Sequence, residues 1–344
     1  MRKFLALCVF VLAACGPTPT PTATPVPPTA TPAAPRPTST APLAATPQTT
    51  RAAPEAGVLL DRLDTVAVSV VWSRDGRYLY VGTETRGLIT YDVETRARLT
   101  VSGEGYIESL AMSPDGLRLA AALGTDGSIR LLDTGFGENI LTLFPTHGGP
   151  VKGLMFSPDG ARLASSGEDG KVMVWDVQTG DKLHDLVAEG DAAWGLAFSP
   201  DGSLLVAGTV RGHEVRVWET ATWTLRNTFE ADQAVDLAFS PDGEHILTAG
   251  GGQNEANIWN VNTGEQVFHL GGASGWVWAV AYAPDGARAA SAGNNEVITL
   301  WDTATGQPAR EFYTGKQFTQ ALAYSPDGTQ LASVSHEVWL WDTR

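Results

Sequence analysis

The sequence predicts an all-β fold of seven similar units, and two repeated features carry this prediction. The first is a Ser-Pro-Asp-Gly type turn, whose successive aspartates are 40, 44, 42, 41, 43 and 42 residues apart. These aspartates are Asp75, Asp115, Asp159, Asp201, Asp242, Asp285 and Asp327. The second is a strand end, Tyr91-Asp92, Leu132-Asp133, Trp175-Asp176, Trp218-Glu219, Trp259-Asn260, Trp301-Asp302 or Trp341-Asp342. A period of about 40–45 residues with such strand ends is typical of four-stranded antiparallel propeller blades. We therefore predict a seven-bladed β-propeller over residues 55–344.

The third unit serves as the template for the strands of each blade. We expect strand a at Val151–Phe156, strand b at Ala161–Ser166, strand c at Lys171–Trp175 and strand d at Asp181–Leu186. Proline presets φ in the turn between strands a and b, and the following glycine accepts a positive φ. A second glycine turn, ending at Gly180, precedes strand d.

The seventh unit has no fourth strand after Trp341-Asp342, and residues near the other end of the chain can supply it. Gly57–Arg62 lies 18 to 13 residues before Asp75, as Leu183–Ala188 lies before Asp201. We predict that this segment is the outer strand of the seventh blade. Such closure removes the exposed edge that an open ring would leave.

The first residues predict export and a lipid anchor. Arg2-Lys3 precedes an apolar run of 11 residues, Phe4–Ala14, which is too short to span a bilayer and typical of a signal peptide. Leu12-Ala13-Ala14-Cys15 resembles the bacterial lipoprotein box, which implies that residues 1–14 are removed and that Cys15 is acylated. Two or more acyl chains anchor a protein stably. The alternative is an ordinary secretory peptide cut near Ala14.

Residues 15–54 predict a disordered linker. Residues 16–54 contain 12 prolines and 11 threonines, a composition that favours polyproline II and cannot bury a core. Fully extended, the segment would reach roughly 120 Å. It is either a plain solvated spacer, which we favour, or an O-glycosylated stalk.

The charge of the chain limits its partners. Residues 1–54 contain four basic and no acidic residues, so residues 55–344 carry 19 basic and 38 acidic residues, a formal charge of −19. Such a surface repels nucleic acid and favours neutral or cationic partners. The only cysteines are Cys8 and Cys15, so the predicted propeller needs no disulfide.

The turns and strand ends together resemble the WD-repeat (WD40) β-propeller family over residues 57–344. The resemblance implies a buried tetrad in which a loop histidine, a strand-b hydroxyl, a turn aspartate and the strand-c tryptophan are hydrogen-bonded. In the third unit these residues are His147, Ser165, Asp169 and Trp175. No other unit has all four, and the second has Leu132 in place of the tryptophan. We expect packing to hold the other blades.

The sequence contains no recognisable catalytic or metal-binding motif. The six histidines are scattered over different blades, and neither a paired-histidine helix nor a Gly-x-Ser-x-Gly elbow is present. We therefore predict a protein that is not an enzyme and that needs no metal or cofactor. The alternative is a hydrolase or carbohydrate-processing propeller with an acidic site at the channel mouth.

Two sets of residues are candidates for binding a partner on the face that carries the d–a loops and the b–c turns. Aromatic side chains lie seven or nine residues before the turn aspartates, at Tyr106, Trp194, Trp276, Trp278 and Phe318. Acidic side chains occur in every b–c turn, and the candidates among them are Glu214, Glu255, Glu296 and Glu337. Aromatic residues dominate interface hot spots, and a ring of acids attracts cations or basic peptides. The alternatives are blade packing for the aromatics and turn solvation for the acids.

These features predict a monomeric, non-enzymatic scaffold that binds a protein or peptide, with basic ones favoured by the charge. Its predicted location is the cell membrane or envelope, anchored in the bilayer through Cys15 and facing outside the cytoplasm.

Overall fold

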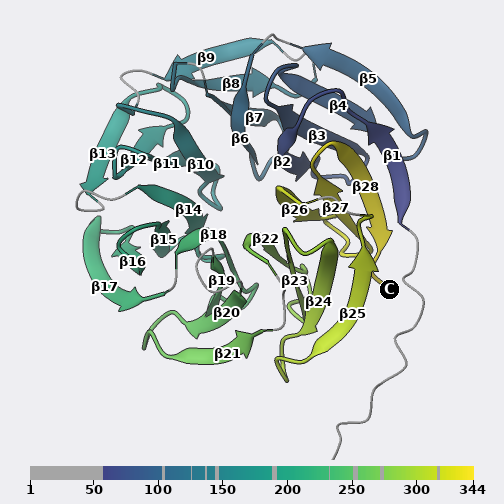
Figure 1. Cartoon of the computed structure of the whole chain (residues 1–344). Helices are drawn as coiled ribbons and strands as arrows, with labels where there is room; N and C mark the ends of the chain where they lie inside the picture. Colours follow the sequence, from purple (N-terminus) through teal and green to yellow (C-terminus); the bar gives the residue numbers. More distant parts are fainter. Residues whose placement is uncertain are drawn as a thin grey trace, which may run out of the picture. The chain divides into compact units, whose positions relative to one another are not determined.

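Seven four-stranded antiparallel sheets form a closed ring (Figure 1). The computed structural model describes residues 57–344, except for 103–104, 125, 136–137, 144–146, 188–191, 232, 251–254, 272–274 and 316–317. The innermost strand of each blade contacts the innermost strands of its two neighbours, and β26 contacts both β22 and β2, so the ring closes. The predicted seven-bladed propeller is confirmed.

The 28 strands follow the chain in blade order. Blade 1 is β2 (Ala67–Trp72), β3 (Tyr78–Thr83), β4 (Leu88–Asp92) and β5 (Ala97–Ser102). Blade 2 is β6 (Ile107–Met112), β7 (Arg118–Leu123), β8 (Ile129–Asp133) and β9 (Asn139–Leu143). Blade 3 is β10 (Val151–Phe156), β11 (Arg162–Gly167), β12 (Lys171–Asp176) and β13 (Lys182–Val187). Blade 4 is β14 (Ala193–Phe198), β15 (Leu204–Thr209), β16 (Glu214–Glu219) and β17 (Thr224–Glu230).

The remaining blades repeat this order. Blade 5 is β18 (Ala234–Phe239), β19 (His245–Gly250), β20 (Glu255–Asn260) and β21 (Gln266–Leu270). Blade 6 is β22 (Val277–Tyr282), β23 (Arg288–Gly293), β24 (Val297–Asp302) and β25 (Pro308–Tyr313). Blade 7 is β26 (Ala321–Tyr324), β27 (Gln330–Val334), β28 (Glu337–Asp342) and β1 (Val58–Arg62). In the template blade, strand a has the predicted bounds, and strands b, c and d each end one residue later than predicted.

The predicted closure is confirmed in blade 7, where the purple β1 lies beside the yellow β28 (Figure 1). Val58 is opposite Leu340 and Arg62 is opposite Glu337 in an antiparallel pair. An ion pair of 3.1 Å joins the side chains of Arg62 and Glu337. The first strand, β1, and the last three strands, β26 to β28, therefore form one sheet.

The core is a set of clusters between neighbouring blades. The strand-c tryptophan of a blade packs against the blade before it. Trp175 of blade 3 packs with Leu131 and Leu143 of blade 2, and Trp218 of blade 4 packs with Val174 of blade 3. Stacking seven sheets in this way buries both faces of each blade without one large central core.

The Ser-Pro-Asp-Gly type turns explain why this sequence pattern recurs. In blade 3, the Ser157 hydroxyl donates to Asp159 Oδ1 at 2.5 Å, and that oxygen also accepts from the Ala161 amide. Gly160 has φ of 71°, as predicted. These hydrogen bonds hold the pKa of Asp159 below its usual value. The turn is thus a local hydrogen-bonded unit that needs serine, aspartate and glycine together.

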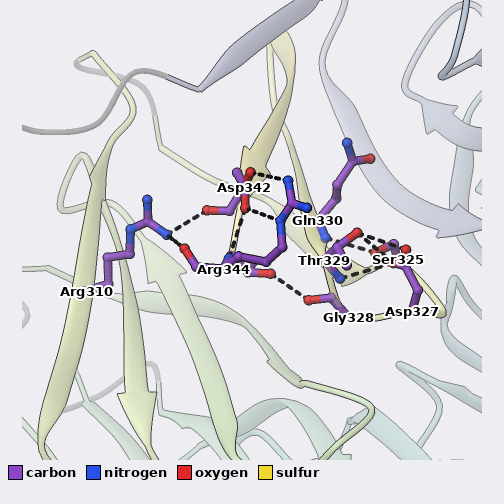
Figure 2. A network of polar contacts seen from close by, with 9 residues as sticks. Arg310, Ser325, Asp327, Gly328, Thr329, Gln330, Asp342 and Arg344 are labelled. Atoms are coloured by element: carbon purple, nitrogen blue, oxygen red, sulfur yellow. Dashed lines mark hydrogen bonds and ion pairs between the residues drawn. The ribbon is translucent and has the colours of Figure 1, made fainter.

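Blade 7 repeats this turn beside the last residues of the chain (Figure 2). Ser325 donates to Asp327 at 2.6 Å, and Thr343 donates to the Gly328 carbonyl at 2.5 Å. From blade 6, Arg310 donates to the Asp342 carbonyl at 2.9 Å and to the Arg344 carbonyl at 2.7 Å. This network ties blade 6 to the blade that closes the ring.

The predicted signal peptide (1–14) and the linker with Cys15 (15–54) lie outside the described residues. Within the residues that the structure describes, it contains no helix long and apolar enough to cross a membrane.

Candidate functional site

The ring has two faces with different loops. On one face, here called the loop face, main-chain hydrogen bonds join the b–c turn of a blade to its d–a loop, as from Glu84 N to the Val66 carbonyl at 2.9 Å and from Asn294 N to the Trp276 carbonyl at 2.9 Å. On the other, the turn face, bonds such as Val177 N to the Ala161 carbonyl join the c–d turn to the a–b turn. The b–c turns and the d–a loops, which contain the candidate acidic and aromatic residues, therefore share the loop face.

A cavity of about 390 Å³ lies at the centre of the ring, lined by the inner strands of all seven blades. Six of these strands carry an irregularity in register near their first residues, among them β6 between Ile107 and Ser109 and β10 between Val151 and Gly153. A β-bulge inserts an unpaired residue and turns its side chain. In each blade, the residue seven before the turn aspartate lines the cavity: Val68, Glu108, Lys152, Trp194, Val235, Trp278 and Gln320.

These seven residues differ in chemistry although the strands around them repeat. They comprise one acid, one base, two tryptophans, two valines and one glutamine. Their side chains therefore give the cavity a different chemistry on each side of the ring. We call this set the bulge ring.

A charged cluster occupies one side of the bulge ring. The Lys152 ammonium contacts Glu108 Oε1 at 2.6 Å and Glu168 Oε1 at 3.2 Å, and it lies 5.0 Å from the centroid of the Trp194 ring. Burial alone would lower the pKa of Lys152, but the two carboxylates raise it above its usual value. The lysine is therefore charged and held in place.

Two polar atoms of this cluster are buried and, among the described residues, have no hydrogen-bond partner. They are Glu108 Oε2 and Trp194 Nε1. A buried acceptor and a buried donor left unpaired cost about 1–3 kcal/mol each, so a ligand that supplies the missing partners is favoured. Beside them, burial and the Glu108 carboxylate raise the pKa of Tyr106.

Blade 5 adds a second acid to the cavity. Asp236 accepts hydrogen bonds from the Leu237 and Val280 amides, both at 2.9 Å, and so joins blade 5 to blade 6. Burial raises the pKa of Asp236 to about 6, and these two hydrogen bonds only partly oppose the shift. With Glu84 and Glu108, it gives the cavity three carboxylates against the single lysine.

The five candidate aromatic residues divide into two groups. Tyr106, Trp194 and Trp278 line the cavity. Trp276 and Phe318 are 43% and 36% exposed on the loop face. The ring of Trp276 lies 5.3 Å from that of Trp278, so the two tryptophans form one surface at the rim, although Trp276 precedes β22 and the register of β22 shifts between Val277 and Ala279. Phe318 meets the His336 ring edge-on at 6.4 Å.

The four candidate glutamates of the b–c turns do not line the cavity, contrary to the expected acidic ring. Glu214 pairs with Arg216 at 3.1 Å, and Glu255 pairs with His269 at 3.2 Å. Glu296 accepts from the Tyr313 hydroxyl at 3.0 Å, and Glu337 pairs with Arg62. These partners belong to strands c and d, so the carboxylates bind outward within their own blades. The acids of the cavity come instead mainly from the inner strands.

The tetrad residues of blade 3 form one hydrogen-bonded chain. His147 Nδ1 lies 2.8 Å from Asp169 Oδ1, and His147 Nε2 lies 2.8 Å from Ser165 Oγ. Trp175 Nε1 donates to Ser165 Oγ at 2.9 Å. The tryptophan-to-hydroxyl bond recurs in blades 5, 6 and 7, at Trp259–Thr248, Trp301–Ser291 and Trp341–Ser333. Part of the tetrad is therefore shared beyond blade 3.

One group of side chains in the described part of the chain has the spacing of metal ligands. Asp242, Glu244 and His245 place one ligand atom each within 4.8 Å of one another on the turn face. Asp242 Oδ1 already accepts from the Ser240 hydroxyl and the Glu244 amide. The group is thereby part of the structural turn of blade 5.

Comparison with known proteins defines the class of protein. Residues 96–133, 137–176, 180–219, 223–260 and 264–302 match the WD40 family, described as WD domain, G-beta repeat. Together these stretches cover more than half of the chain, so the chain belongs to the WD40 family. Each match runs from the outer strand of one blade to strand c of the next, as in 96–133, which contains β5 to β8.

Similar curated proteins come from several eukaryotes. The chain is 34% identical over 128 residues to the APC/C activator protein CDC20 of Saccharomyces cerevisiae (36% of this chain, 20% of the relative). It is 25% identical over 189 residues to a guanine nucleotide-binding protein subunit beta of Arabidopsis thaliana (52% and 50%). It is 35% identical over 124 residues to the small ribosomal subunit protein RACK1y of Oryza sativa subsp. japonica (34% and 35%). The matched region spans between a fifth and a half of the length of these relatives.

Sequence reasoning missed the central charges of the site. Glu108, Lys152 and Asp236 were not among the candidates. The inner strands were expected to be apolar and buried, so a single charged residue within one of them did not indicate a binding site. The signal was available: Glu108 and Lys152 stand at the same position before the turn aspartate as Trp194 and Trp278, which were candidates.

Proposed function

We propose that the protein is a non-enzymatic scaffold whose loop face binds a protein or peptide partner through a basic side chain placed in the channel mouth. The observation that carries this proposal is the cavity itself, which is lined by the three carboxylates of Glu84, Glu108 and Asp236 against the single ammonium of Lys152. The buried Glu108 Oε2 supports it, although the Glu108 carboxylate also acts on the neighbouring Tyr106 hydroxyl. A lysine or arginine of the partner would complete that pairing.

The aromatic rim supports the same partner. The Trp276 and Trp278 rings lie together beside the mouth, where they can cover the stem or the cation of an inserted basic side chain. Among the similar proteins are one named as an activator, one named as a subunit and one named as a small ribosomal subunit protein. They support a binding role and identify no partner for this chain.

The experiment is a binding assay on arrays of short peptides that differ only in lysine, arginine, glutamate or alanine at a central position. We expect basic peptides to bind the wild type and to lose at least about tenfold affinity with Glu108→Gln or Trp278→Ala. Glu219→Gln is the matched control, because Glu219 is exposed on the turn face. Equal binding of basic and acidic peptides, or unchanged affinity in both variants, would contradict the proposal.

We also propose that the scaffold is anchored outside the cytoplasm through acylated Cys15, with residues 16–54 as a spacer. The support is the apolar run that ends at Cys15 and the proline- and threonine-rich composition after it. Metabolic labelling with an alkyne fatty acid in a bacterial host tests this. Cys15→Ser should lose the label and the membrane fraction, whereas Cys8→Ser should keep both. Membrane association of unlabelled Cys15→Ser would argue against a lipid anchor.

A further inference from the structure

A second cavity lies at the outer part of the interface between blades 1 and 2, away from the channel. It has a volume of about 350 Å³. Its walls are Tyr78, Tyr80, Leu88, Thr90, Leu99 and Thr100 from blade 1, and Leu119, Leu132 and residues 133–135 from blade 2. We call it the blade 1–2 pocket.

The pocket lies where other blades place an indole ring. Leu132 occupies in blade 2 the position of Trp175 in blade 3, since Leu132 pairs with Leu119 as Trp175 pairs with Leu163. The Trp175 ring is fully buried between blades 2 and 3. Leucine is smaller than tryptophan, so the same space between blades 1 and 2 is left partly empty.

The walls of the two sites correspond position by position. Trp175 lies in one core cluster with Ala120, Ile129, Leu131, Leu141 and Leu163. The equivalent residues of the blade 1–2 pocket are Tyr80, Leu88, Thr90, Thr100 and Leu119, as the strand pairings place them. The pocket is therefore the tryptophan site of this fold without its tryptophan.

Two differences change the chemistry of the walls. Tyr80 replaces an alanine and enters part of the space from blade 1. Thr90 and Thr100 replace two leucines, so hydroxyl groups stand where the wall of the Trp175 site is apolar. The pocket still presents Tyr78, Leu88 and Leu119 to an occupant. Its chemistry suits a flat ring that carries a hydrogen-bonding group.

We propose that the blade 1–2 pocket binds an aromatic ring of the indole or phenol class, supplied from outside the chain in place of the missing tryptophan. An apolar cavity that a large side chain has vacated accepts small aromatic molecules, as shown for an engineered cavity in another protein. For a ligand of this size we expect a Kd on the order of 1 mM. The site is independent of the channel mouth and of the partner proposed there.

Ligand-observed NMR with the full chain tests the proposal, with indole and phenol as the probes and cyclohexanol as a non-aromatic control of the same size as phenol. Indole and phenol should bind the wild type, and cyclohexanol should bind at least about tenfold more weakly than phenol. The ring could belong to an aromatic residue of a partner protein or to a free small molecule. Binding of N-acetyltryptophanamide, which imitates a tryptophan residue within a chain, distinguishes these two sources. Binding as tight as that of indole indicates an aromatic residue of a partner, and binding of indole alone indicates a free molecule.

Leu132→Trp should fill the pocket and reduce indole binding at least tenfold. Leu225→Trp is the matched control, because Leu225 is 49% exposed on the outer strand of blade 4 and does not line the pocket. If Leu132→Trp fails to fold, the double variant Tyr80→Ala, Leu132→Trp recreates the pair of Ala120 and Trp175 between blades 2 and 3 and should fold without binding indole. No binding to the wild type at about 20 mM indole, or unchanged binding in a folded filled variant, overturns the proposal.

Discussion

Blade 3 and blade 2 have the same four strands and different ways of filling the space beside strand c. In blade 3, Trp175 fills the interface and donates to Ser165, which His147 also contacts. In blade 2, Leu132 and Ala121 occupy the positions of Trp175 and Ser165, and Tyr80 of blade 1 reaches in from the opposite side. The two blades show that the ring tolerates either complete filling of this space by one tryptophan or partial filling by Leu132 and Tyr80, which leaves the blade 1–2 pocket between them.

The largest effect is expected when Trp175 of blade 3 is replaced by leucine, the residue that blade 2 has at this position. Trp175→Leu should lower the free energy of unfolding by about 3–5 kcal/mol, because it empties a fully buried site and removes a hydrogen bond. Urea unfolding followed by circular dichroism measures the change. Adding Ala120→Tyr, which copies Tyr80, should recover about 1–2 kcal/mol. A loss below about 1 kcal/mol in the single variant would show that the tryptophan is dispensable.

The serine of the tetrad offers a reciprocal exchange. Ser165→Ala should cost about 2 kcal/mol, since it leaves Trp175 Nε1 and one His147 nitrogen buried without their partner. Ala121→Ser in blade 2 should also destabilise, by about 1–2 kcal/mol, because Ala121 is 1% exposed and faces no tryptophan that could donate to it. Thermal melting of both variants tests the pair. Stabilisation by Ala121→Ser would mean that a partner exists which the comparison overlooks.

Blade 3 and blade 5 each contain an aspartate whose pKa is shifted, and the two shifts have opposite directions. For Asp169, burial opposes ionisation, but hydrogen bonds from His147 and the Gly148 amide hold the pKa below its usual value. Its contribution to stability is present above about pH 4 and is lost as pH falls further. Asp236 behaves in the opposite way, because its pKa of about 6 in the folded state exceeds the unfolded value. Its ionisation therefore costs stability as pH rises from about 4 to above 6.

Asp236→Asn isolates this effect. Two pKa units correspond to roughly 3 kcal/mol, and the residual exposure of Asp236 reduces our expectation to about 1–2 kcal/mol. We expect the wild type to lose that stability between pH 5 and pH 8 and the variant to lose less. Urea midpoints at several pH values provide the measurement. Parallel pH profiles for the two proteins would place the titration elsewhere.

The smallest test concerns the turns. Blade 6 has Ala283 where six blades have serine, and there Asp285 accepts from the Ala287 amide alone among the hydrogen bonds described for this turn. Ala283→Ser should add the missing hydroxyl-to-carboxylate bond and stabilise by about 0.5–1 kcal/mol. Ser157→Ala, its counterpart in blade 3, should lose a similar amount. A shift of the melting temperature in the same direction for both variants would refute this account of the turn.

The sequence was sufficient for the fold because each repeat contains its own turn chemistry. Ser157, Asp159 and Gly160 act within five residues, so their pattern is visible without tertiary information. The same locality allowed β1 to be assigned to blade 7 by spacing alone. The bounds of the strands were predicted to within one residue in the template blade.

The candidate site was harder to predict from the sequence, because it depends on the direction in which each side chain points. The carboxylates of Glu214 and Glu255 were expected at the channel mouth, but Arg216 and His269 on neighbouring strand positions bind them. A bulge that directs Glu108 and Lys152 into the cavity has no sequence signature of its own. The blade 1–2 pocket required knowing that Tyr80, about 50 residues before Leu132, faces it. The repeats predict the fold, whereas the role of a residue that departs from the repeat can be assigned only when its neighbours in the structure are known.

The pairing of β1 with β28 imposes a delay on the completion of blade 7 during synthesis of the chain. During synthesis Val58 emerges early, and its partner Leu340 emerges only after six blades have been made. At typical rates of about 5–20 residues per second, the wait is roughly 15–60 s. Blade 7 therefore forms only when both Val58 and Leu340, about 280 residues apart, have been made, and until then β1 has an unpaired edge that neighbouring chains could capture. The speed with which blade 7 is completed thus sets how long a nascent ring stays vulnerable to exchange of strands between copies.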